Sequence, residues 1–85
     1  MSEAYLKKIL GLSNIAWQSY KKWSQTPIEA RNDPYWDKVT HEIKELVNQH
    51  ADDDTKQFFT DTLNAYAGQL DHEASKQYKQ ERLML

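Results

Sequence analysis

His41 is the residue whose neighbours most suggest chemistry, because the stretch HEIKE that begins there resembles the start of the zinc-binding helix motif His-Glu-x-x-His. Glu45 occupies the position where that motif requires its second histidine, so the motif is incomplete. Asp37 with His41, and His72 with a neighbouring carboxylate, each offer only two ligands, whereas structural zinc sites need four and catalytic ones three. The sequence therefore predicts no metal site.

Nucleophilic catalysis has no better support in the sequence. The chain contains no cysteine, and its serines fall in helical or helix-capping contexts, without the strand–turn–helix elbow that exposes a catalytic serine. Only two glycines occur, so a glycine-rich phosphate-binding loop is also absent from the sequence. We therefore predict that the protein is not an enzyme, has no catalytic residue and uses no cofactor.

Four lysines are the main charged feature of the N-terminal part of the chain. At about 100° per residue they fall on the polar side of one predicted helix, and they are Lys7, Lys8, Lys21 and Lys22. A nucleic-acid recognition helix can carry such a face, but the net charge of −2 and the presence of only two arginines argue against it. Nucleic-acid binding through these lysines is the alternative hypothesis.

The stretch AWQSYKKW, which begins at Ala16, concentrates aromatic residues beside two of these lysines. Trp17, Tyr20 and Trp23 continue an apolar arc that begins with Leu6 and covers roughly 160° of the helix. We interpret this arc as one side of a hydrophobic core, in preference to a dedicated binding surface. A small-ligand carrier is the second alternative, with an aromatic pocket formed by Trp17, Tyr20, Trp23, Tyr35 and Trp36.

The elements that would position these residues are all helical. Apolar residues recur with helical spacing, and the cap signals Ser2, Thr26-Pro27, Asp33-Pro34 and the acidic run at 52–54 separate the periodic segments. We predict helices at about 3–24, 34–50 and 54–82, with one short helical turn near 27–31. Similar packed lengths and short connections predict an all-α fold, an antiparallel three-helix bundle.

The C-terminal segment exceeds what such a bundle needs. The apolar stripe of the third predicted helix fades after Ala74, so we expect a bundle domain at 1–74 and a helical extension or frayed tail at 75–85. The extension carries side chains without a place in the core, and Ile15 is a large apolar residue on the polar side of the first helix. The predicted protein-binding residues are Ile15, Tyr78, Arg82, Leu83 and Met84.

Composition narrows the class of function further. Without cysteine, disulfides are excluded, and the sequence holds no targeting signal and no run of the roughly 20 apolar residues that span a bilayer. We expect a cytoplasmic protein, without a membrane partner, that binds another protein as a regulator, inhibitor, immunity factor or assembly factor. A homodimer is one of the assemblies that the sequence leaves open.

Overall fold

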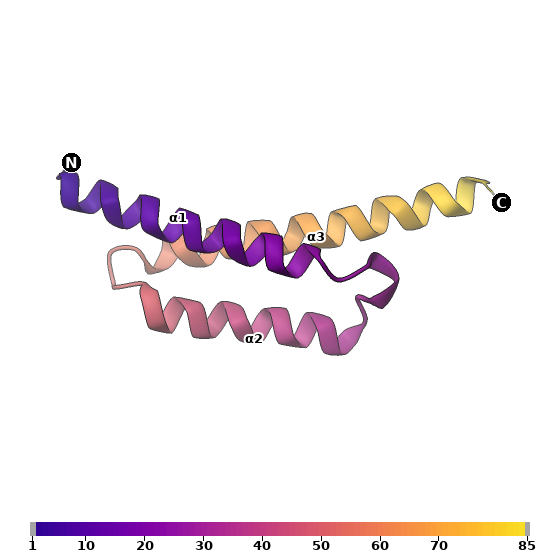
Figure 1. Cartoon of the computed structure of the whole chain (residues 1–85), viewed down its shortest axis with the longest axis horizontal. Coiled ribbons are helices and arrows are strands. Elements are labelled where there is room, and N and C mark those ends of the chain that lie inside the picture. Colours follow the sequence, from indigo (N-terminus) through magenta and orange to yellow (C-terminus); the bar gives the residue numbers. More distant parts are fainter. Residues whose placement is uncertain (1, 85) are drawn as a thin grey trace.

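The protein consists of three long helices (Figure 1). The structure is a computed structural model, and it describes the backbone of residues 2–84 and the side chains of residues 2–76. The helices are α1, Glu3–Ser24, α2, Asp33–His50, and α3, Lys56–Met84, with a short 3-10 turn, η1, at Ile28–Ala30. The described part of the chain contains no strand. The predicted all-α three-helix bundle is confirmed, including the short helical turn.

Side-chain caps explain where the helices begin. The amide of Tyr5 donates to Ser2 Oγ at 3.2 Å, and Asn32 Oδ1 caps α2 in the same way. Before α3, the carboxylate of Asp52 accepts both from the amide of Thr55, at 3.0 Å, and from its hydroxyl, at 2.9 Å. These caps satisfy amides that have no partner within the helix.

The connection between α1 and α2 is held by Arg31. Thr26 does not cap the short turn as its cap signal suggested, because Pro27 occupies the cap position of η1 and no side chain caps the turn. Instead, the Arg31 guanidinium donates to the carbonyl oxygens of Thr26, at 3.0 Å, and Leu70, at 3.3 Å. Arg31 thereby fastens this connection to α3.

Helix α3 packs against both other helices and runs parallel to α1. Lys8 Nζ lies 2.6 Å from Asp52 Oδ2 near the start of both helices, and the Tyr20 hydroxyl donates to Glu73 Oε1 at 2.7 Å further along. Helix α2 returns in the opposite direction (Figure 1). The predicted up-down-up order is therefore correct.

The core lies where the three helices meet. Phe59, Leu63 and Leu70 of α3 are fully buried, which makes α3 the centre of the packing. Among the residues whose side chains are described, the other buried apolar ones come from α1 and α2, and they are Leu12, Ala16, Trp23, Val39, Ile43 and Val47. Beyond the end of α1, the last part of α3 projects past the bundle as a helix that runs to Met84 (Figure 1). The division into 1–74 and 75–85 stays a prediction.

Candidate interaction face

Three large apolar side chains of α1 are exposed on one side of the helix. Leu6 is 53% exposed, Leu10 62% and Trp17 47%, and their spacing of four and seven residues places them in one line. The interpretation of these three as core residues is wrong. The predicted apolar arc of α1 is wider than the surface that α2 and α3 cover, so one edge of the arc remains outside the core.

Trp17 is held in place although nearly half of it is exposed. Its ring stacks on that of Tyr20, with centroids 5.9 Å apart, and lies 6.4 Å from the ring of Tyr66 on α3. Tyr20 and Tyr66 also contact each other, with centroids 5.0 Å apart. The hydrogen bond to Glu73 fixes the Tyr20 ring and raises the pKa of its hydroxyl. An exposed, pre-positioned aromatic ring loses little conformational entropy when a partner covers it.

A shallow hollow of about 490 Å³ runs along the adjacent side of α3. Its lining residues recur with alternating spacings of three and one, which places them on one side of the helix, and they are Phe58, Asp61, Thr62, Ala65, Tyr66 and Gln69. The lining forms two adjacent rows of residues spaced four apart, Phe58–Thr62–Tyr66 and Asp61–Ala65–Gln69, and the small Ala65 side chain is at the middle of the second row. A stripe of this kind fits the side chains of another helix laid along it.

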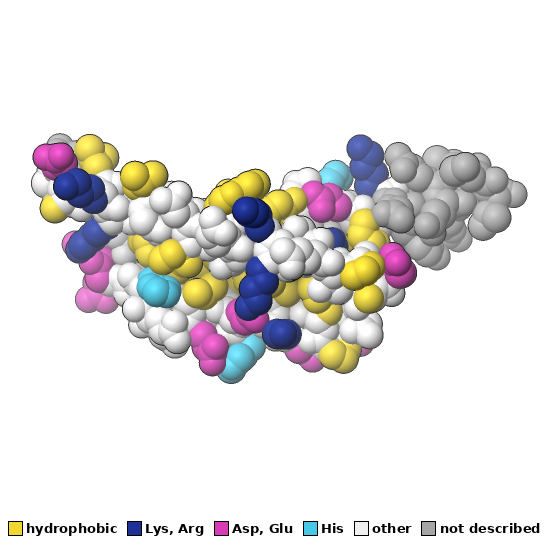
Figure 2. Space-filling view, in the orientation of Figure 1, with side chains coloured by type: hydrophobic (Ala, Val, Ile, Leu, Met, Phe, Trp, Pro, Cys, Tyr) yellow, Lys and Arg dark blue, Asp and Glu magenta, His cyan; other side chains and the backbone are white. Residues whose placement is uncertain are grey.

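Tyr66 joins the two features, because it lines the hollow and also contacts the Trp17 ring. We call the combined surface, made of Leu6, Leu10, Trp17 and the lining residues of the hollow, the α1–α3 face. Figure 2 shows hydrophobic side chains gathered along the edge of the molecule over α1. Helical periodicity grouped Leu6, Leu10 and Trp17 correctly but gave no sign that this group would remain uncovered.

The residues predicted to bind protein lie elsewhere. Ile15 is half-buried and packs against the core, so it is not the exposed apolar residue that the sequence suggested. It packs against the core because the segment before α3 and α2 both approach this side of α1, as the ion pairs of Lys8 with Asp52 and of Lys22 with Glu42 show. The backbone of α3 continues through the other four positions. Their side chains lie outside the described residues, and they are Tyr78, Arg82, Leu83 and Met84.

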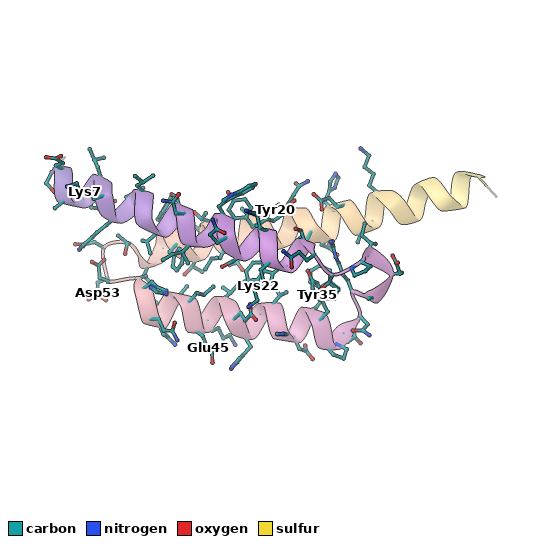
Figure 3. The ribbon with its side chains drawn as sticks, viewed as in Figure 1. Lys7, Tyr20, Lys22, Tyr35, Glu45 and Asp53 are labelled. Atoms are coloured by element: carbon teal, nitrogen blue, oxygen red, sulfur yellow. The ribbon has the colours of Figure 1, made fainter. Side chains whose placement is uncertain are left out.

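The four lysines of the nucleic-acid hypothesis do not form one free basic face. Lys8 pairs with Asp52 at 2.6 Å and Lys22 with Glu42 at 3.1 Å, whereas Lys7 and Lys21 are exposed. Figure 3 shows Lys22 directed toward α2 and Lys7 near the start of α1. Two of the four charges are therefore matched by carboxylates of other segments. Nucleic-acid binding stays a prediction.

The aromatic residues of the carrier hypothesis separate into two groups. Trp17 and Tyr20 lie on the α1–α3 face, whereas the Trp23 indole is only 4% exposed and donates to Glu42 Oε2 at 2.6 Å. Tyr35 and Trp36 contact each other edge to face, and their polar atoms bond to backbone carbonyls, the Tyr35 hydroxyl to that of Trp23 at 2.8 Å. Trp23, Tyr35 and Trp36 thus have structural partners.

Burial raises the pKa of the Glu42 carboxyl, but the hydrogen bonds from Trp23 and Lys22 outweigh it, so the pKa is lowered. Glu42 is therefore a charged partner of α1 within the bundle.

Among the described residues, no group of three or more His, Cys, Asp or Glu side chains is placed to hold a metal ion. In the same part of the chain, no helix is long and apolar enough to cross a membrane.

Comparisons were made with protein-family models, with curated proteins and with solved structures. None of the three found a match. The function is therefore inferred from the described surface of the chain, on which the α1–α3 face carries exposed large apolar side chains.

Proposed function

We propose that this chain is a non-enzymatic protein that acts by binding another protein through its α1–α3 face. The observation that carries the proposal is the exposure of Leu6, Leu10 and Trp17 in one line beside the hollow on α3. Contiguous exposed apolar surface of this kind is typical of protein-interaction sites. Trp17 has features of an interface hot spot, because it is aromatic, exposed and already oriented by its contacts with Tyr20 and Tyr66.

The shape of the face favours a helical partner. The hollow extends over three turns of α3, from Phe58 to Gln69, and its lining is apolar except for Asp61, Gln69 and the hydroxyl groups of Thr62 and Tyr66. An amphipathic helix buries its apolar side in such a groove through residues spaced three or four apart. Polar groups at the edge of the groove then set orientation.

Action as a regulator, inhibitor, immunity factor or assembly factor is compatible with this surface, and a cytoplasmic location is part of the same proposal. The C-terminal end of α3 is the second predicted contact, through Tyr78, Arg82, Leu83 and Met84. That contact can be separated from the α1–α3 face experimentally, because it lies beyond Leu70, the last buried residue among those whose side chains the structure describes.

A matched pair of variants tests the proposal. Leu10→Glu places a carboxylate in the α1–α3 face, whereas Gln18→Glu places one on another exposed part of α1. Both residues are exposed, so both variants should keep the helical circular dichroism of the wild type. In affinity capture from the source cells, a specific partner should be retained by the wild type and by Gln18→Glu and lost with Leu10→Glu.

The captured protein is then purified and its binding to the three chains is measured by calorimetry. Leu10→Glu should weaken binding by more than about tenfold, because an unpaired carboxylate would be buried in the interface. Equal binding of the three chains would show that the α1–α3 face is not the surface that the partner recognises.

A further inference from the structure

We infer that the helix that fits the α1–α3 face is α1 of a second copy of this chain, so that two copies pair through a two-fold axis parallel to the helices. This inference rests on the proposed function and names its partner. Each copy would place Leu10 and Trp17 on the hollow of the other copy. The same contact would be made twice, as closed two-fold symmetry requires.

The position of the residues along the helices supports this pairing. Helices α1 and α3 run in the same direction, and Trp17 lies level with Tyr66 near one end of the hollow. Leu10 lies seven residues earlier, or about 10 Å along α1, which is less than the roughly 12 Å that separate Tyr66 from Phe58. Leu10 and Trp17 therefore fall within the length of the hollow. Rotation about a two-fold axis parallel to the helices does not shift any residue along the helix direction. When α1 of one copy lies over α3 of the other, Leu10 and Trp17 therefore stay at the same height as the hollow.

The distribution of charge favours this parallel arrangement over an antiparallel one, in which α1 of one copy would lie against α1 of the other. Lys7 and Lys21 border the exposed line of α1, whereas the lining of the hollow on α3 carries the carboxylate of Asp61. The parallel arrangement brings the lysine-bearing side of α1 against the carboxylate-bearing side of α3. A two-fold axis perpendicular to the helices would instead lay α1 against α1, with lysines facing lysines, which is unfavourable.

The chain exposes more surface than a compact protein of the same mass. The chain exposes 6363 Å², whereas a compact monomer of 10.1 kDa is expected to expose about 5,300 Å². The difference exceeds the roughly 800 Å² that each partner buries in a standard interface. The elongated shape of the chain, 55 × 24 × 18 Å, contributes to this difference.

Sedimentation equilibrium of the purified full chain tests the inference, over concentrations from about 1 μM to about 1 mM. The wild type and Gln49→Glu, which places a carboxylate on the exposed side of α2, should pass from monomer to dimer with the same dissociation constant. Leu10→Glu should raise that constant by about thirtyfold or more, because the carboxylate would be buried without a partner. A chain that ends at Ala74 keeps the face and should dimerise like the wild type.

A wild type that stays monomeric throughout, a dimer that is insensitive to Leu10→Glu, or a dimer lost on truncation at Ala74 would each overturn the inference. These results are distinct from failure of the proposed function. If the wild type is monomeric but captures a different protein in a Leu10-dependent way, the second copy is excluded and the proposed function stands. If no Leu10-dependent binding of any kind occurs, both fail.

Introduced cysteines report the arrangement, because the native chain contains none. Asn14 is exposed on α1 and Ala65 is exposed in the hollow of α3. An equal mixture of the Asn14→Cys and Ala65→Cys chains should form mixed disulfide dimers faster than either chain pairs with itself. Faster self-pairing of Asn14→Cys would instead place α1 against α1 and would overturn the parallel arrangement.

Discussion

Arg31 donates to three backbone carbonyl groups, those of Ser24, Thr26 and Leu70, at 3.3, 3.0 and 3.3 Å. A carbonyl oxygen has two lone pairs, so Leu70 can accept from Arg31 in addition to its bond within α3. The guanidinium also lies 5.9 Å from the centre of the Tyr35 ring. One side chain thus connects the end of α1, the loop and the middle of α3.

Replacement of this side chain should reduce stability. Arg31→Met keeps much of the aliphatic stem but removes all three hydrogen bonds, so the free energy of unfolding should fall by about 1–3 kcal/mol. Arg31→Lys should recover only part of the loss, because an ammonium group cannot reproduce the planar guanidinium geometry. Urea titration followed by tryptophan fluorescence measures both, with the exposed Lys44→Met as control. Equal stability of Arg31→Met and Lys44→Met would contradict this role.

The lowered pKa of the Asp52 carboxyl predicts that the stability of the fold depends on pH. The hydrogen bond from Lys8, followed by that from Thr55, lowers the pKa of the Asp52 carboxyl from 3.8 to about 2. As pH falls from about 4 to about 2, the unfolded chain takes up the proton before the folded chain does. The contribution of Asp52 to stability is therefore complete above pH 4 and is lost toward pH 2.

Asp52→Asn should remove this step from a plot of unfolding free energy against pH. Asp53→Asn is the matched control one residue further along, and it should retain the step. Urea titrations at intervals between pH 2 and pH 6 provide the measurement. If the three chains give parallel profiles, the pairing of Asp52 with Lys8 does not contribute to folding.

Helix α3 combines two parts with different roles. Up to Glu73 and Ala74 its side chains are engaged with the bundle, through the buried Leu70 and the hydrogen bond from Tyr20 to Glu73. Beyond these residues the helix continues to Met84 without another helix beside it (Figure 1). The bundle should therefore fold without the extension.

A chain that ends at Ala74 should keep a single cooperative thermal transition, with a free energy of unfolding within about 1 kcal/mol of the full chain. A chain that ends at Gln69 also loses Leu70, and this should cost about 2–5 kcal/mol because a fully buried leucine is removed. Circular dichroism with heating compares the three lengths. Loss of the cooperative transition at Ala74 would make the extension part of the folding unit.

Local sequence signals were enough to predict the elements. Ser2 caps α1 as expected, and the three predicted helices agree with the structure within two residues at each end. The exposure of Leu10 and the burial of Ile15 were not predictable in the same way. Periodicity shows which residues share a side of a helix, whereas burial depends on how far the neighbouring helices extend around it. That extent is a tertiary property.

The shape of the whole molecule provides a further prediction. Its Cα atoms extend over 55 × 24 × 18 Å, and their radius of gyration of 15.3 Å exceeds the roughly 12 Å expected for a compact chain of this length. Two copies paired side by side would double the mass and the width but not the length. Small-angle X-ray scattering of the dimer should therefore give a maximum dimension close to that of the monomer. A dimension near twice that value would indicate association end to end.

The α1–α3 face as the interaction surface is tested most directly by amide chemical shifts of the ¹⁵N-labelled chain, recorded during dilution or during titration with a captured partner. The shifts should change in the α1 turns that contain Leu6, Leu10 and Trp17 and in the α3 turns from Phe58 to Gln69. The exposed side of α2, around Lys44, should not respond. Changes confined to α2, or to the end of α3 beyond Ala74, would contradict the account and would place the interaction on another surface.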